Sequence, residues 1–177
     1  MSSDIVPLIP KATIGQRAAA FCIDAIAVWL PSLLIGTNPI VHTIFFILLW
    51  MIMRVPVARK NQGQSLGRWA VNVKVVDPQL KRLPGVQELC KREAVLGTCA
   101  ALAFAGIGGL TSTNAAVLLL LLPLAIDCSP AFTDTERFPQ ALHDRLAGTI
   151  VTGTRRGYFL DIKVKRLLDQ VQSNVRR

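Results

Sequence analysis

The chain has 177 residues, of which 51% are hydrophobic, and its mean hydropathy is +0.43. A soluble domain of this length usually has a lower apolar fraction and more charge, so the composition favours a membrane protein. Its 20 lysines and arginines outnumber its 11 acidic residues, giving a net charge of +9. Nucleic acid, an anionic membrane surface or cytoplasmic loops would each explain this excess, and the positions of the basic residues must decide between them.

Four apolar stretches approach the roughly 20 helical residues that a bilayer core requires. They cover residues 17–35, 39–53, 94–110 and 115–127, and each ends at a charge or a helix breaker. The segment 94–127 has no charge before Asp127, but a single span of about 33 residues would exceed the membrane thickness. We therefore predict an all-α membrane protein with about four transmembrane helices arranged as two hairpins. Three spans are the alternative.

The basic residues are confined to three parts of the sequence. Lys11 and Arg17 precede or open the first span, nine lie from Arg54 to Arg92, and nine lie from Arg137 to the end. The short connections around 36–38 and 111–114 contain none. The positive-inside rule then predicts that both termini and the central loop are cytoplasmic. This accounts for the net charge without a nucleic-acid partner, and anionic lipids are expected at the cytoplasmic face.

Two strand-like runs lie on the predicted cytoplasmic side. "WAVNVKVVD", residues 69–77, alternates apolar and polar residues, and "GTIVTGT", residues 148–154, is a second such run. We expect the two runs to pair as a small cytoplasmic strand element. The tail beyond Arg156 is predicted to be an amphipathic helix that contacts anionic headgroups, or else a solvated end.

The predicted third span has a small residue at every fourth position. Gly97, Ala101, Ala105 and Gly109 form a ridge that would let another helix approach closely, from the same chain or from a second copy. Pro31 and Pro123 are expected to kink the first and fourth spans.

A weak internal repeat follows the two hairpins. "GRWAVNV", residues 67–73, and "DRLAGTI", residues 144–150, share an arginine, a large apolar residue and an alanine. In a parallel repeat, Arg17 of the first hairpin would correspond to Arg92 of the second.

Two charged residues stand in the otherwise apolar first span. Arg17 and Asp24 lie seven residues apart, so they share a helix face but are separated by about 10 Å along the axis. Helical side chains lean toward the N-terminus, and direct contact would be stretched. An ionised carboxylate at the depth of Asp24 costs up to about 2.5–3.5 kcal/mol, so we expect a basic partner or a bound proton. Arg17, Arg145 or another residue near the "LHDR" block is the expected partner.

Two other acidic residues near the ends of the predicted spans are expected to have local structural roles. Asp127 ends the fourth span and is expected to be an interfacial cap, and Glu93 is expected to pair locally with Arg92. The most distinctive cytoplasmic cluster is "ALHDRLAGTIV", in which His143, Asp144 and Arg145 stand together before a strand-like run.

Three sequence blocks, in order, resemble the RDD family of prokaryotic integral membrane proteins. They are "RAAAFCID", "GQSLGRWAVNVKVVD" and "LHDRLAGTIV". The resemblance covers residues 14–152, which leaves 1–13 as an N-terminal segment and 153–177 as a basic tail. The family is named for an arginine and an aspartate in the first helix and for a second aspartate, which match Arg17, Asp24 and Asp144, with Asp77 as the alternative for the third. It implies an inner-membrane location and a transport role for ligands that are not identified.

The charged residues support two functional hypotheses. In the first, the protein is a small transporter or ion-coupled permease whose binding residues are drawn from Arg17, Asp24, His143, Asp144 and Arg145. Four spans leave little room for a pathway, so a homo-oligomer or another membrane protein is expected as partner. In the second, it is a scaffold, assembly or regulatory subunit whose buried charges fix helix packing.

An enzyme is not expected. The sequence contains no HExxH, GxSxG or nucleotide-binding glycine motif, and its two histidines lie on opposite sides of the predicted membrane. Four cysteines without CxxC spacing give no reason to expect a metal cluster, and no cofactor is expected.

Overall fold

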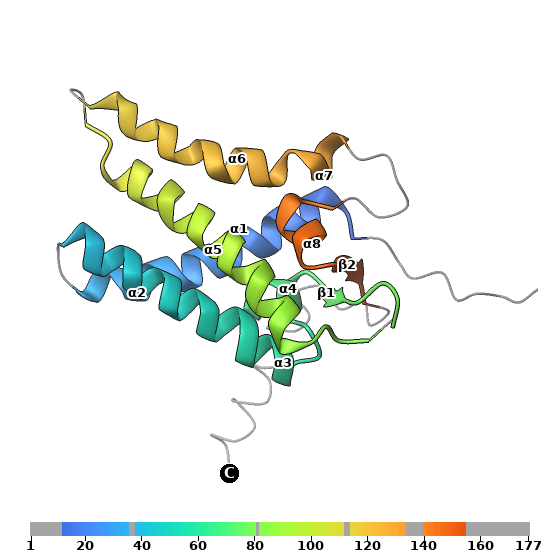
Figure 1. The fold of residues 1–177 in the computed structure, drawn as a ribbon. Helices are drawn as coiled ribbons and strands as arrows, with labels where there is room; N and C mark the ends of the chain where they lie inside the picture. Colours follow the sequence, from blue (N-terminus) through green and yellow to red (C-terminus); the bar gives the residue numbers. More distant parts are fainter. Residues whose placement is uncertain (1–11, 36–37, 81, 112–113, 134–139, 155–177) are drawn as a thin grey trace, which may run out of the picture.

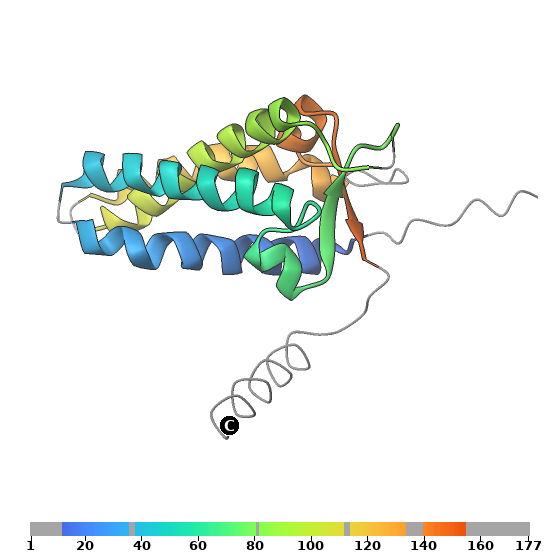
Figure 2. The same cartoon turned by 90° about the horizontal axis from the view of Figure 1, so that it is seen from below.

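The computed structural model describes residues 12–35, 38–80, 82–111, 114–133 and 140–154. Long helical segments run side by side, with two connections at one end of the molecule and short helices and strands at the other (Figures 1 and 2). The predicted tail helix beyond Arg156 lies outside the described residues. The long segments are α1 (Ile14–Ser32), α2 (Pro39–Ile52), α5 (Val86–Gly108), and a 3-10 helix over Ala115–Leu121 that leads into α6 (Leu122–Cys128).

Local sequence signals set the boundaries of the first hairpin. Thr13 caps α1 in a capping box with Gln16, which satisfies backbone donors that the helix leaves open. Asn38 caps α2 in the same way, accepting from the backbone N–H groups of Ile40 and Val41. Pro31 lies inside α1, which gives way to a 3-10 turn after Ser32.

The second helical segment runs past the charge at which we expected it to end. A π-helical turn, Met53–Val57, carries it through Arg54 into α3 (Ala58–Lys60). Pro56 lies in this turn and cannot donate the backbone hydrogen bond of a regular α-helix, and a wider turn accommodates that loss. The helix does not end at Arg54, because the side chain of Arg54 is buried inside the protein and does not have to reach water.

Two of the described helical segments are long and apolar enough to cross a membrane. They are Ile14–Ile35 and Pro39–Lys60, each with a mean hydropathy of 2.0. Only 28% and 22% of their apolar parts are buried, so most of their large side chains face outward, unlike those of a soluble core helix. The apolar segment Ala115–Cys128 is shorter, and α5 begins two turns before the expected span, so a count of four spans stays a prediction.

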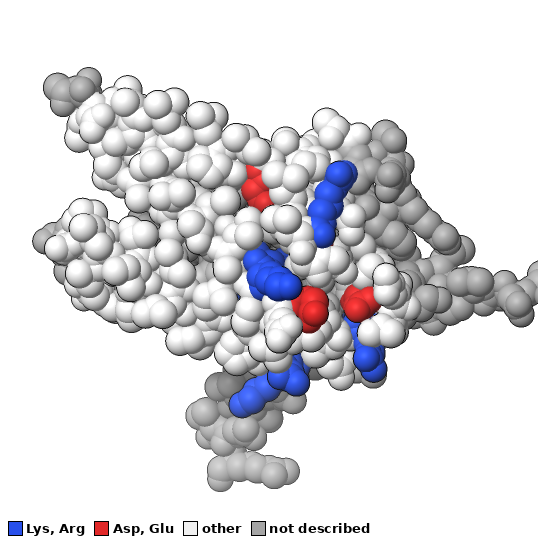
Figure 3. Space-filling view, in the orientation of Figure 1, with Lys and Arg blue, Asp and Glu red and all other residues white. Residues whose placement is uncertain are grey.

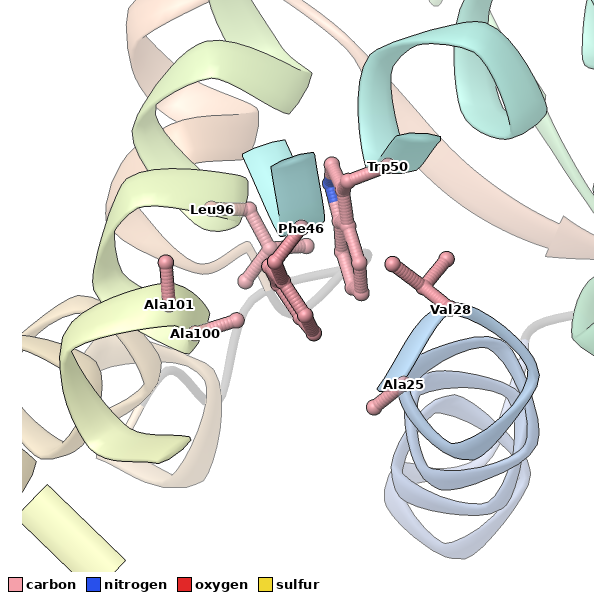
Figure 4. Packing of buried hydrophobic residues seen from close by; sticks show 7 residues of the cluster. All are labelled: Ala25, Val28, Phe46, Trp50, Leu96, Ala100 and Ala101. Carbon is pink, nitrogen blue, oxygen red and sulfur yellow. The ribbon is translucent and has the colours of Figure 1, made fainter. Parts of the chain in front are cut away.

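The main hydrophobic cluster joins α1, α2 and α5 (Figure 4). Trp50 and Phe46 stack with ring centroids 5.8 Å apart, and a Cβ added at Gly97 of α5 would lie 2.6 Å from the Trp50 ring. At Gly97 and Ala101 the predicted small-residue ridge therefore packs within the same chain, against α2. The buried members of the cluster are Ala25, Val28, Phe46, Trp50, Leu96, Ala100 and Ala101.

The predicted strand pair is confirmed. β1 (Val73–Val76) and β2 (Ile150–Gly153) are antiparallel, with Val73 opposite Gly153. A short helix precedes each strand, α4 (Leu66–Ala70) before β1 and α8 (Leu142–Leu146) before β2. Each helix reaches its strand through a residue of positive φ, Asn72 at 60° and Gly148 at 62°. This common order of elements after each hairpin is the arrangement that a parallel repeat requires.

Candidate functional site: a buried ion network

Charged side chains gather where the long helices meet α4, α8 and the strands. Figure 3 shows charged groups on that half of one face, while the half with the helix connections is uncharged. Nine largely buried residues, all charged except for a histidine, are connected to one another by ion pairs, and we call this set the ion network. Arg17 has the most exposed side chain of the nine, at 14%. Its members are Arg17, Asp24, Arg54, Arg68, Arg92, Glu93, Asp127, His143 and Asp144.

Asp24 is held by three groups from two other elements. Its Oδ2 lies 3.1 Å from Nη1 of Arg54 and accepts a hydrogen bond of 2.5 Å from the Ser65 hydroxyl. Its Oδ1 accepts a 2.7 Å bond from the backbone N–H of Gly67. The expectation that the partner would come from the region of the "LHDR" block was wrong, because Arg54 follows the other helix of the same hairpin.

Gly67 allows α4 to lie directly on α1. A Cβ at this position would come within 2.1 Å of the Ala20 carbonyl oxygen and 3.0 Å of the Asp24 carboxyl carbon. Because the obstructing atoms include backbone, a side chain here would push α4 off α1 and stretch the bonds to Asp24.

We expect Gly67→Ala to lower the free energy of unfolding by about 1–3 kcal/mol, the usual range for overpacking. The measurement is denaturant or thermal unfolding of the purified protein in micelles. Gly108→Ala is the matched control, because a Cβ there meets nothing within 4 Å and alanine suits a helix better than glycine. Equal stability of the two variants would contradict the close approach of α4 and α1.

Glu93 is the acceptor for three arginines. Nε of Arg54 lies 2.8 Å from its Oε2, and Arg68 and Arg92 both bind its Oε1. The expected local pair with Arg92 is therefore one part of a larger contact that joins α4, α5 and the π turn. The guanidinium of Arg54 also lies 4.5 Å from the Trp50 ring centroid, which ties the network to the hydrophobic cluster.

Asp144 receives one arginine from each hairpin. Arg17 of α1 binds its Oδ2, and Nε of Arg92 of α5 donates to its Oδ1 at 2.7 Å. Burial raises the pKa of Asp144, but the charges of Arg92, His143 and Arg17 outweigh it and hold the pKa well below its usual range. Of the two candidates for the second aspartate, Asp144 lies in the network. Asp77 accepts from backbone N–H groups in a turn after β1.

Asp127 is part of the site and not an interfacial cap as expected. It is 2% exposed and accepts from the backbone N–H of His143 at 2.9 Å and faces His143 Nδ1 at 2.5 Å. His143 Nε2 lies 3.5 Å from Asp144, so the histidine connects α6 with the rest of the network. Arg145, the third residue of the predicted cluster, is exposed on α8.

The candidates chosen from the sequence include neither Arg54 nor Arg68, and they also leave out Arg92, Glu93 and Asp127. From the sequence alone, Arg54 is expected at the end of a span and Arg68 in a cytoplasmic loop. The available signal was the balance of charge, since each carboxylate buried near a membrane needs a basic partner. The network in fact contains four carboxylates and four arginines, besides His143.

A cavity of about 180 Å³ borders the network. All four network arginines and His143 line it, and none of the described residues in its lining is acidic. The remaining lining is mostly apolar, and its exposed residues are Ile14, Ala18 and Cys22 of α1 and Phe132 of α7 (Pro130–Thr133).

The fold and site define a small helical membrane protein built around a buried ion network with a cavity beside it. The sequence model of the RDD family matches residues 11–148, and the chain belongs to this family. No curated protein and no solved structure matches the sequence.

Proposed function

We propose that this protein is a small membrane transporter that binds its solute in the cavity beside the ion network. The observation that carries the proposal is the position of this cavity, which is lined by the four arginines and the histidine of the network and by apolar residues of α1. Cavities that combine apolar walls with a few converging polar groups are the usual form of a ligand site.

The partners of Asp24 indicate that a solute would bind to the arginines of the network and not to this carboxylate. Both oxygens of Asp24 already accept hydrogen bonds or an ion pair, so a cation there would have to displace Arg54, Ser65 or Gly67. Asp144 and Glu93 are each shared by two or more arginines, and such shared carboxylates allow an arginine to exchange partners when a solute binds.

The transport proposal includes an orientation and an assembly. The end of the bundle with α4, α8 and the strands is cytoplasmic, because the sequence of the two connections at the other end, around 36–38 and 111–114, contains no basic residue and the positive-inside rule applies. One chain offers few helices to enclose a pathway, so the transporting unit is a homo-oligomer or a complex with another membrane protein.

Blocking the cavity tests the proposal without touching the network. Ala18 and Ala19 are both exposed on α1, but only Ala18 lines the cavity. We expect proteoliposomes to take up at least one of radiolabelled chloride, inorganic phosphate or short-chain phosphatidic acid faster than protein-free liposomes, because arginines and no acidic residue are among the described residues that line the cavity. Ala18→Phe should reduce that uptake at least tenfold and Ala19→Phe should leave it unchanged. Uptake no faster than in protein-free liposomes, or equal uptake by both variants, would contradict transport through this cavity.

A non-transporting scaffold or regulatory subunit is the second candidate. The observation that favours it is that every carboxylate of the network is paired, which is what a set of charges that fixes helix packing requires. Ala18→Phe distinguishes the two, because Ala18 lines the cavity and lies outside the ion network. A scaffold keeps its stability and its cellular phenotype in this variant, whereas a transporter keeps its stability but loses uptake.

A further inference from the structure

We infer that the cavity binds a phosphate group, and that its apolar walls favour the phosphate of an anionic lipid over free phosphate. This inference rests on the proposed function in taking the cavity as the ligand site. It adds the chemical class of the ligand.

The charges on the cavity wall are of one sign. Four arginines line it, one each from α1, the π turn, α4 and α5, while the carboxylates that hold them are outside the described lining. A guanidinium presents forked donors that match phosphate oxygens two at a time, and several arginines around one site suit a phosphate dianion better than a singly charged carboxylate.

Arg68 has a donor that its protein partners leave open. Its Nη2 donates to Glu93, but Nη1 is buried and has no hydrogen-bond partner among the described residues. The residue is only 2% exposed, and burial together with the charge of Arg54 lowers the pKa of its guanidinium to about 9, which keeps it charged at pH 7. A buried N–H without an acceptor is rare in native structures. Because Arg68 lines the cavity, a bound phosphate whose oxygen reaches this N–H would satisfy it.

The rest of the lining suits the apolar part of a lipid. Phe21 and Leu96 contribute apolar wall, and Phe132 at the edge is 67% exposed. Cys22, which also lines the cavity, lies on the exposed side of α1, a helix long and apolar enough to face lipid. A headgroup could therefore enter between α1 and α7 while its acyl chains stay along the outer surface of the bundle. Inorganic phosphate would leave these apolar surfaces without a partner.

Equilibrium binding to the full-length protein in micelles tests the inference with two probes, phosphatidic acid and inorganic phosphate. We expect saturable binding of radiolabelled phosphatidic acid, and at least tenfold weaker binding to Arg68→Gln. Arg59→Gln is the matched control, since Arg59 is exposed on α3 and the charge change is the same. Because Arg68→Gln removes a network partner, Ala18→Phe provides a second variant that obstructs the cavity with the network intact, and it should weaken binding to a similar degree.

The two probes separate the sources of the phosphate group. Saturable binding of inorganic phosphate, lost in both cavity variants while phosphatidic acid does not bind, would support the phosphate site and overturn the lipid assignment. Binding of neither probe, or binding that the cavity variants leave unchanged, would overturn the inference. The assay needs no flux, so a protein that binds phosphatidic acid but transports nothing contradicts the proposed function alone.

Discussion

Replacing Glu93 by glutamine should have the largest effect of any single substitution in this protein. Glutamine keeps the shape of the side chain but removes the charge that three buried arginines share. Arg54, Arg68 and Arg92 would then repel one another where all three are buried. Breaking a buried ion pair typically costs about 3–5 kcal/mol, and here one change affects three pairs. Since small proteins are stable by only about 5–15 kcal/mol, we expect Glu93→Gln to be largely unfolded.

The measurement is the yield of folded protein in micelles together with its thermal unfolding. Glu88→Gln is a matched control, because Glu88 is on the same helix in its first turn and is only partly buried. We expect it to change stability by no more than about 0.5 kcal/mol. A Glu93→Gln protein as stable as this control would show that the three arginines find their compensation elsewhere.

Asp24 and Arg54 should behave as a coupled pair. Asp24→Asn leaves the Arg54 charge facing a neutral amide, and Arg54→Gln leaves a buried carboxylate with only the bonds from Ser65 and Gly67. Each single change is expected to cost about 3–5 kcal/mol. The double variant removes both charges, so its cost should be about 1–3 kcal/mol less than the sum of the two.

Unfolding free energies of the four proteins in the same detergent give this coupling directly. Asp77→Asn serves as the control, since Asp77 accepts backbone hydrogen bonds in a turn and asparagine can accept them as well. Additive costs would mean that the Asp24 and Arg54 charges do not depend on each other. That result would remove the reason for assigning Arg54 as the partner of Asp24.

These two predictions concern stability, and both functional candidates share them. A network that holds the cavity arginines in place is needed by a transporter, and a scaffold needs the same network for packing. The candidates differ at Ala18, which lines the cavity and lies outside the ion network. Its substitution should affect only a protein that uses the cavity.

Much of the architecture follows from sequence patterns alone. The apolar stretches, the confinement of basic residues to one predicted side and the alternation around Val73 and Val75 are local signals, and local signals predict helices, strands and their approximate ends. The family resemblance likewise implies Arg17, Asp24 and either Asp144 or Asp77 as functional residues. The structure confirms the strand pair and places Arg17, Asp24 and Asp144 in one network.

Only the tertiary structure decided which charges meet. Helix periodicity fixes the face on which Asp24 lies but not the side chain that faces it from another element, so Arg54 could not be chosen from the sequence. For the same reason the sequence predicts that Arg54 ends one span and that Arg92 precedes another, although the helices continue through both residues. A charged residue marks the end of the membrane-spanning part of a helix when its side chain must reach water. Arg54 and Arg92 instead pair with carboxylates inside the protein.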